Sequence, residues 1–276
     1  MISLTILIPW KDRDELGLTL NNNSHAFKRS RASVIVVNCG GDTSQLLSLT
    51  KKCDFPIEIV DIRGFEFNKS RALNIGINYA RSEYVFNIDA DVMITEDTMM
   101  TLMNSLRPGY MTTIERLEES SKICGIRHDR ESAIRDIVTE ETTRFVWTNG
   151  QETVVPNFRR YFSDGSRGGQ GQLLVRKEDL TSIDGYNSEL VGWGYEDIDI
   201  LIRLQRLAGL SHLQMGEAIH LSHDDQRRCI YGVSKSVNNR RNATAAYKRY
   251  SIGQFRGTLS ADLLATEHAV TIVKTQ

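Results

Sequence analysis

The chain has 276 residues, of which 40% are hydrophobic and 25% charged. This length fits one large α/β domain, and the composition allows a substantial buried core. The formal net charge of −1 argues against a protein that binds nucleic acid through a diffuse basic surface. No window approaches 18 consecutive apolar residues, so we expect no membrane-spanning segment.

The apolar start of the chain, over residues 1–9, is short and lacks both a basic leader and a small-residue cleavage site. We therefore interpret it as a buried strand and not as a signal peptide. The four cysteines form no Cys-x-x-Cys pair and lie in or near apolar runs, which favours reduced thiols. We expect a cytoplasmic protein, with peripheral association at the inner face of a membrane left open.

The first third of the chain alternates strand and helix patterns. Apolar, β-branched runs predict strands over 4–8, 33–37, 57–62 and 84–88, and helical spacing predicts a helix over 71–80. This alternation predicts βαβ units and a mostly parallel central sheet flanked by helices. Parallel sheets bind ligands at the carboxyl ends of their strands, where Pro9, Asn38 and Asp89 fall.

The rest of the chain is less regular. The middle, over about 109–169, is polar and mixed in charge, and its glycine-rich end over 163–169 predicts a mobile loop. Short strands are predicted over 172–175 and 218–221. After Tyr231 the chain is basic and predicts a helix, followed by a last apolar segment over 268–273.

A dense motif, Gly-Trp-Gly-Tyr-Glu-Asp-Ile-Asp, covers residues 192–199, directly ahead of an apolar helical run. Glycines beside an aromatic residue let the backbone approach a ligand closely, and the flat ring of Trp193 suits stacking on a sugar. Carboxylates at the start of a helix lie where its dipole favours the anionic form. The motif therefore indicates a site that activates a hydroxyl group next to a sugar, although a capped turn with a core tryptophan is the alternative reading.

Two further motifs suggest a metal site. Asp89 and Asp91 follow an apolar strand, and two carboxylates one residue apart can share a hard divalent cation and hold the oxygens of a diphosphate. A solvated acidic turn is the alternative. His220 and His223 lie within four residues of each other, and imidazole suits Mn²⁺ and related ions better than Mg²⁺.

These segments together resemble the β-1,4-galactosyltransferases. Residues 9–13 resemble their P-F-R-N-R opening, residues 67–76 their F-N-R-A-K-L-L-N-V-G, and residues 89–91 their D-V-D. Residues 168–199 are similar to their G-G…G-F…G-W-G-G-E-D-D-D, and His220-x-x-His223 falls where that family has Met-x-x-His. Bacterial chondroitin-polymerase-type and other family 2 glycosyltransferases share much of this pattern.

The resemblance implies a GT-A fold and a metal-dependent, inverting glycosyltransferase that uses a UDP-sugar donor and a glycan or other acceptor. It implies Mn²⁺, or Mg²⁺, held by Asp91, His220 and His223, with Asp197 as the catalytic base and Glu196 binding the acceptor. The residues expected to bind the nucleotide-sugar are Pro9, Lys11, Arg13, Asn38, Phe67, Lys69, Asp89 and Trp193.

The resemblance also divides the chain. It implies a catalytic domain over 1–225, with a nucleotide-sugar half over about 1–110 and an acceptor half over 165–225. The remainder, 226–276, would be a helical extension, and we expect the segment from Asp224 to about Tyr247 to order as a lid when the donor binds.

Departures from the family pattern leave the donor sugar open: Tyr195 stands where the family has glycine, and Asn38 where many family 2 enzymes have aspartate. His220 replaces the family's methionine, and imidazole is a competent metal ligand there. Two other functions stay open at this stage. One is a nucleotidyltransferase, although residues 10–13 lack the glycines of its phosphate loop, and the other is a non-catalytic glycan-binding module.

Overall fold

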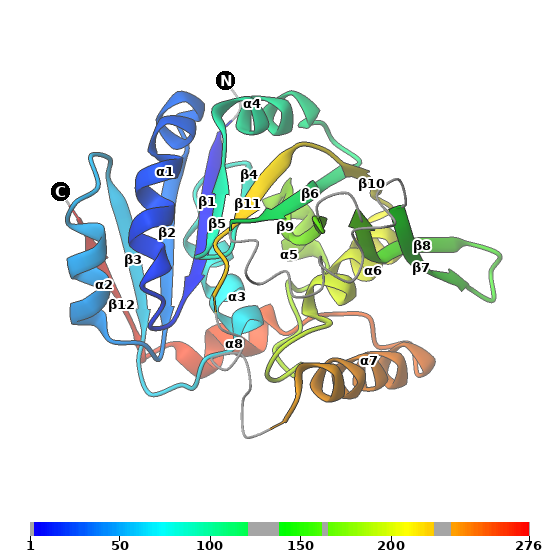
Figure 1. Ribbon diagram of the computed structural model, residues 1–276. Coiled ribbons are helices and arrows are strands. Elements are labelled where there is room, and N and C mark those ends of the chain that lie inside the picture. The colour runs from blue at the N-terminus through cyan, green and yellow to red at the C-terminus, as the bar shows by residue number, and fades with distance from the viewer. Residues whose placement is uncertain (1–2, 121–137, 162–164, 224–232, 276) are drawn as a thin grey trace.

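The computed structural model describes residues 3–120, 138–161, 165–223 and 233–275 (Figure 1). The strands of this part of the chain are β1 Leu4–Trp10, β2 Ser33–Cys39, β3 Ile57–Ile62, β4 Tyr84–Asn87, β5 Val92–Ile94, β6 Tyr110–Glu119, β7 Val138–Val146, β8 Glu152–Tyr161, β9 Arg167–Arg176, β10 Ser211–Gln214, β11 Glu217–His220 and β12 Val270–Lys274. The helices are α1 Glu15–Ser30, α2 Thr43–Thr50, α3 Lys69–Tyr79, α4 Glu96–Ser105, α5 Lys177–Ser182, α6 Glu196–Ala208, α7 Lys235–Ser251 and α8 Leu259–Thr266.

The described strands join in one twelve-stranded sheet whose main path runs β12-β3-β2-β1-β4-β9-β6-β11-β5. Its first half is parallel: β1 pairs with β2 and β4, and β2 pairs with β3, all in the same direction. These four strands confirm the runs predicted from the sequence, and α3 confirms the helix between β3 and β4. The α/β fold with helices around a central sheet is therefore confirmed.

The second half of the sheet is mixed. Strand β9 runs antiparallel between β4 and β6, β11 runs parallel to β6, and β5 runs antiparallel to β11. The strands predicted over 172–175 and 218–221 are confirmed as parts of β9 and β11. Because β9 begins at Arg167, the loop predicted over 163–169 is wrong for its last three residues; residues 162–164 lie outside the described part of the chain.

Each face of the sheet carries its own apolar core. One core joins alternate residues of β1 and β2 to α1, α2 and α4, and includes the fully buried Trp10. The other core joins the opposite residues of the same strands to α3, α5, α6 and α7. The period-two alternation of Leu4, Ile6 and Ile8 against Leu7 explains how one strand serves both cores.

The chain directions bring the functional motifs to one edge of the sheet. Strands β1, β2, β3, β4, β6 and β11 all point the same way, so their carboxyl ends lie at the same edge. The starts of the opposed strands β5 and β9 lie there too. This edge therefore brings together residues from the start of the chain, such as Pro9, and from its last quarter, such as His223.

The segment predicted as a helical extension holds α7 and α8, as expected, and also β12, which pairs with β3 at the outer edge of the sheet. The division into domains and the lid over 224–247 stay predictions, since residues 224–232 lie outside the described part of the chain. Among the described helices, none is both long and apolar enough to cross a membrane. Cys39 and Cys53 are free thiols; the other two cysteines lie outside the described residues.

Candidate active site

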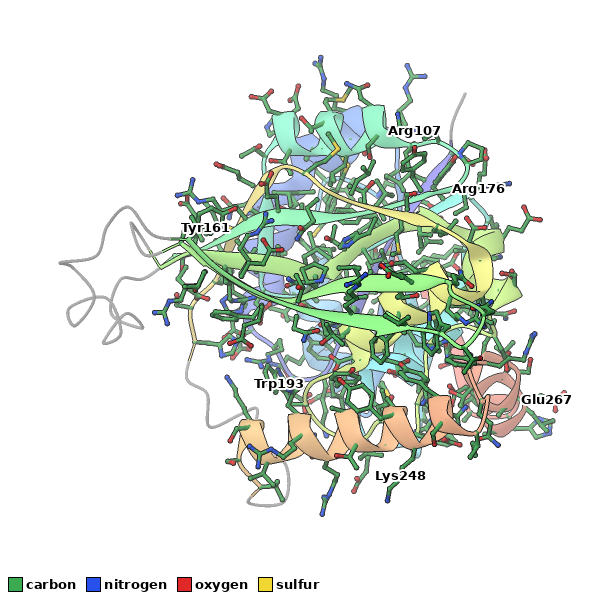
Figure 2. All side chains as sticks on the ribbon, turned by 90° about the vertical axis from the view of Figure 1, so that its right-hand side faces the viewer. Arg107, Tyr161, Arg176, Trp193, Lys248 and Glu267 are labelled. Atoms are coloured by element: carbon green, nitrogen blue, oxygen red, sulfur yellow. The ribbon has the colours of Figure 1, made fainter. Side chains whose placement is uncertain are left out.

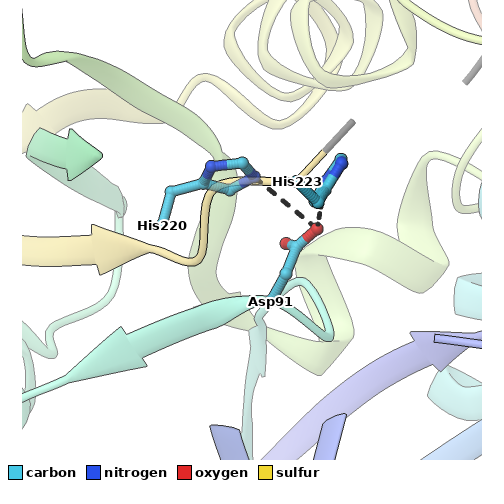
Figure 3. Close-up of side chains that lie close together, drawn as sticks. All are labelled: Asp91, His220 and His223. Carbon is cyan, nitrogen blue, oxygen red and sulfur yellow. Dashed lines mark hydrogen bonds and ion pairs between the residues drawn. The ribbon is translucent and has the colours of Figure 1, made fainter. Parts of the chain in front are cut away.

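A cluster of one carboxylate and two imidazoles lies at the carboxyl edge of the sheet (Figure 3). The Nε2 atom of His223 lies 3.0 Å from Oδ2 of Asp91, and Nε2 of His220 lies 3.5 Å from the same oxygen. One ligand atom from each residue falls within 4.8 Å of the other two. Nitrogen and oxygen donors at this separation can hold one divalent cation.

Strand pairing explains why these three residues meet. His220 ends β11, and Asp91 immediately precedes β5, which pairs antiparallel with β11. The N–H of Leu221 donates to the carbonyl of Asp91 at 2.7 Å, which fixes the turn between the histidines beside the aspartate. The metal-ligand set predicted from the sequence is thus brought together in space.

A fourth residue, Glu119, supports the cluster and was not predicted. It ends β6 opposite His220 in the parallel β6–β11 pairing, and its Oε2 lies 2.8 Å from Nδ1 of His220. Burial alone would raise the pKa of Glu119, but the hydrogen bonds from His220 and Ser222 and the nearby Arg167 lower it to about 2. An anionic Glu119 fixes the His220 ring with Nε2 turned toward Asp91, as carboxylates do behind metal-binding histidines.

A second cluster, on the same edge of the sheet, places one ammonium group among three carboxylates. The Nζ atom of Lys69 lies 3.0 Å from Asp89, 3.1 Å from Asp197 and 3.7 Å from Glu196. Lys69 is the first residue of α3, and the Asn68 side chain caps that helix by accepting from the Arg71 N–H. We expected Lys69 beside the nucleotide; the structure places its ammonium between the Asp-x-Asp motif and the carboxylates of α6.

Burial and charge shift the ionisation of this second cluster. Burial and, less strongly, the neighbouring Asp197 together raise the pKa of Glu196 to about 7, although Lys69 opposes the shift. Burial also raises the pKa of Asp197, against the lowering effect of Lys69. Burial alone would lower the pKa of Lys69, but the carboxylates hold it well above its usual range. The cluster therefore contains a permanent cation and two carboxylates whose proton affinity is increased.

Two residues of β9 shape this cluster and were also missed. The Gln172 side chain donates to Oδ2 of Asp89 at 2.9 Å and accepts from the Asp89 N–H at 2.8 Å, so it fixes that carboxylate. A Cβ atom at Gly171 would lie 2.8 Å from Oδ2 of Asp197, closer than real contacts allow. The glycine therefore makes room for the carboxylate. A polar-glycine run in a strand, Gly-Gly-Gln-Gly-Gln, was the only sequence signal for this.

The predicted Gly-Trp-Gly motif forms the loop ahead of α6. Gly192 and Gly194 both have positive φ, and Tyr195 caps α6 in the left-handed region at φ +72°, where the resembled family has glycine. The Trp193 side chain is 40% exposed, so it is available to a ligand and is not a core residue. Helix α7 holds this loop from outside, since the Asn242 side chain donates to the carbonyl of Gly194 at 2.8 Å.

The residues expected to line the nucleotide pocket lie at the ends of β1, β2 and α3, on the same edge. Arg13 has a buried Nη1 atom that finds no hydrogen-bond partner among the described residues, as expected of a group that awaits an anion. The Asn38 side chain is engaged differently: it donates to Oδ1 of the buried Asp61 at 2.8 Å. Lys11 is exposed, and Phe67 is half-buried next to the cap of α3.

The fold has known counterparts. A Drosophila β-1,4-galactosyltransferase 7 variant, solved with manganese, UDP-Gal and xylobiose, is similar at a TM-score of 0.50 and 16% identity over 86% of this chain and 79% of that one. S. aureus TarS is similar at 0.50 and 14% over 80% of this chain, which spans 37% of that structure. These likenesses identify the fold as that of the GT-A glycosyltransferases.

The sequence itself also matches a known protein family. The family model described as glycosyltransferase-like family 2 matches residues 7–230, and the chain belongs to that family. It is therefore a glycosyltransferase. A 4-diphosphocytidyl-2C-methyl-D-erythritol synthase from Anaerococcus prevotii is also similar, but its TM-score of 0.45 is too low to assign its fold or function to this chain. No curated protein sequence matches the chain significantly.

Proposed function

We propose that this glycosyltransferase moves a sugar from a UDP-sugar to a hydroxyl group of a glycan or glycoconjugate, with inversion at the anomeric carbon. The contact that carries the proposal is Lys69, whose ammonium bridges Asp89 of the Asp-x-Asp motif and Asp197 at the start of α6. It makes the donor motif and the proposed base parts of one site.

The donor half of the proposal rests on the Asp91, His220 and His223 cluster. Their donor set fits Mn²⁺, with Mg²⁺ less suited to two imidazoles. When bound, such a cation would neutralise negative charge that develops on the diphosphate leaving group. The similar galactosyltransferase structure contains manganese and UDP-Gal, which supports the same donor chemistry here. The unpaired Arg13 nitrogen offers a further positive group for the nucleotide.

The acceptor half rests on Asp197 and Trp193. Burial raises the pKa of Asp197, which makes its carboxylate a stronger base than a surface aspartate. Asp197 accepts the proton of the attacking hydroxyl while its oxygen forms the new bond to the anomeric carbon. The bond from that carbon to the diphosphate breaks, and its electron pair leaves with UDP. Glu196, which is more buried than Asp197, binds the acceptor, and the exposed Trp193 ring stacks on a sugar.

A screen of nucleotide-sugars tests the proposal. Thermal shift with UDP-Gal, UDP-GalNAc, UDP-GlcNAc, UDP-Glc and matched GDP-sugars, with and without Mn²⁺, identifies the donor, and UDP release in the presence of acceptors measures transfer. The proposal predicts a Mn²⁺-dependent shift with at least one UDP-sugar and release that depends on Asp197. Formation of a nucleotide-sugar from UTP and a sugar phosphate would instead support the nucleotidyltransferase alternative. Binding of glycans without any UDP release would support the glycan-binding module.

A further inference from the structure

Helix α7 is strongly basic in a protein whose net charge is −1. Its seventeen residues include five arginines or lysines and no aspartate or glutamate. The family model ends at residue 230, before this helix. The charge of α7 therefore belongs to a part of the chain that the family pattern does not describe.

The inner face of α7 is used to hold the active-site loop and α6. The Asn238 side chain donates to the carbonyls of Val191 and Trp193, and the buried Asn242 donates to that of Gly194. The Tyr250 hydroxyl donates to Oδ1 of Asp199, near the start of α6, at 2.6 Å. The inner face of α7 therefore makes hydrogen bonds to the loop ahead of α6 and to the first turn of α6, next to the proposed base.

The outer face of α7 carries cationic side chains that, among the described residues, make no hydrogen bonds of this kind. Arg240, Arg241 and Lys248 are exposed, and within the described part of the chain no carboxylate pairs with them. Arg249, by contrast, pairs with Glu189 across to the neighbouring segment. Figure 2 shows Lys248 pointing away from the body of the protein on this helix. The small polar side chains of Ser236 and Thr244 lie on the same exposed side of α7.

This basic face continues toward the acceptor end of the active site. Trp193 lies by the N-terminal end of α7 (Figure 2), and Nζ of Lys235, the first residue of the helix, lies 5.2 Å from the centre of its ring. A chain that followed Lys248, Arg241 and Arg240 along the helix would therefore arrive at the exposed aromatic ring. From there the start of α6, with Asp197, is four residues away in sequence.

We propose that the acceptor of this enzyme is an anionic polymer, and that the outer face of α7, with Arg240, Arg241 and Lys248, binds its charged repeats while Trp193 receives the sugar end. The inference rests on the proposed glycosyl transfer. It names the acceptor class by charge complementarity: three exposed cations with interleaved hydroxyls suit a sulfated, carboxylated or phosphodiester-linked chain.

A membrane surface fits this face less well. Amphipathic helices that bind bilayers bury a broad apolar face in the lipid. Ala246 and Tyr250 of α7 are buried against the protein. Val237 and Tyr247 are the exposed large apolar residues of the helix, and two such side chains do not make a broad apolar face. The charge of α7 is therefore suited to a soluble polyanion.

Binding measurements on the full-length protein test the inference without the need for activity. Dextran sulfate, hyaluronan and neutral dextran are titrated into the wild type and into a variant with Arg240→Gln, Arg241→Gln and Lys248→Gln. Loss of three exposed ion pairs should weaken polyanion binding about tenfold. Neutral dextran should bind more weakly than either anionic chain. The matched control carries Lys51→Gln, Lys52→Gln and Arg81→Gln, three exposed cations away from α7, and should bind like the wild type.

The outcomes separate this inference from the proposed function. UDP binding with Mn²⁺, measured on the same samples, should be equal in all three proteins, because the contacts of α7 with the loop ahead of α6 come from Asn238 and Asn242, which all three proteins keep, whatever part the predicted lid has in donor binding. If it is intact but the α7 variant and the control bind dextran sulfate equally, the acceptor inference is overturned while the glycosyltransferase proposal stands. Absent UDP binding in the wild type would count against the proposed function itself. Sedimentation with vesicles of phosphatidylglycerol and phosphatidylcholine that is lost only in the α7 variant, without a change in polysaccharide binding, would assign the face to a membrane and overturn the inference.

Discussion

The two aspartates of the Asp-x-Asp motif are two positions apart, yet they lie in different charge environments. Asp91 faces His220 and His223, whereas Asp89 faces the Lys69 ammonium and the Gln172 amide. One cluster is built from donors that a metal ion prefers, and the other already holds its own cation. We propose that the two aspartates serve different parts of the site: Asp91 binds the donor through a metal ion, and Asp89 connects the motif, through Lys69, to the carboxylates of α6.

Replacement of the proposed base, Asp197 of the second cluster, should give the largest loss of turnover. Asp197→Asn should lower turnover roughly 10²–10⁴-fold, the range typical for loss of a general base. UDP affinity in the presence of Mn²⁺ should stay near that of the wild type, because Asp197 belongs to the Lys69 cluster and not to the set of proposed metal ligands. Glu196→Gln is the matched comparison, with a smaller loss expected. Near-normal turnover in Asp197→Asn would transfer the base role to Glu196.

The raised pKa of Glu196 gives the next effect, on stability. An acid whose pKa is higher in the folded state stabilises the fold while it is protonated, and this contribution is lost as pH rises through its folded value of about 7. We expect the free energy of unfolding to fall by up to about 3 kcal/mol between roughly pH 5 and pH 8. Denaturant titrations should show a flatter pH profile in Glu196→Gln and an unchanged one in the exposed Glu178→Gln. An equally steep profile in Glu196→Gln would show that this carboxyl does not titrate as described.

Glu119 tests the support of the first cluster. Glu119→Gln removes the anion behind His220 and should weaken Mn²⁺ binding about 10- to 100-fold, as is typical for such supporting carboxylates. UDP affinity without metal should not change. The matched control is Glu118→Gln, the neighbouring and more exposed residue of β6. Equal Mn²⁺ affinity in both variants would mean that the Glu119–His220 contact does not tune a metal site.

His220→Met places the residue of the resembled family in the first cluster. Because a thioether is a softer ligand than imidazole, we expect activity to be kept with a shifted metal preference. Activity profiles with Mn²⁺, Mg²⁺ and Co²⁺ measure this. An unchanged profile would indicate that His220 does not ligate the ion.

The contact between α7 and the loop ahead of α6 gives the smallest expected effect on turnover, and it should affect the second cluster but not the first. Asn242→Ala removes the amide that donates to the carbonyls of Val191 and Gly194, and loss of these two hydrogen bonds should lower the free energy of unfolding by about 2 kcal/mol. Turnover should fall several-fold because the loop ahead of Asp197 loosens, while Mn²⁺-dependent UDP affinity is kept. Ser251→Ala, exposed at the C-terminal end of the same helix, is the control. A parallel loss of UDP affinity would show that α7 supports both clusters.

Strands β1 to β4 each have a continuous apolar run that ends in a polar turn, so local patterns were sufficient to predict this half of the sheet. Local motifs also indicated Asp91, His220 and His223, whereas Lys69 and the roles of Asp197 and Glu196 could be predicted only from the family resemblance. The partners of those residues could not be predicted. Glu119 meets His220 because β6 and β11 pair in one particular register, 101 residues apart, and no local pattern encodes that register. The β7–β8 hairpin was missed because its exposed strands lack a clear alternation.

Lys69 is a second residue whose contacts could not be predicted from its local motif. Its motif indicated a residue near the nucleotide, but its ammonium also meets Asp197, 128 positions later, because α3 and α6 both begin at the same edge of the sheet. Gly171 is informative only once Asp197 is known to lie against it.

The separate roles proposed for the two clusters are tested most directly by calorimetric titration of UDP with and without Mn²⁺. The proteins compared are the wild type, Asp91→Ala, His223→Ala and Asp197→Asn. The account predicts that Mn²⁺ tightens UDP binding in the wild type and in Asp197→Asn, and that this gain is lost in Asp91→Ala and His223→Ala. Equal UDP affinity with and without Mn²⁺ in the wild type, or loss of the gain in Asp197→Asn, would contradict it.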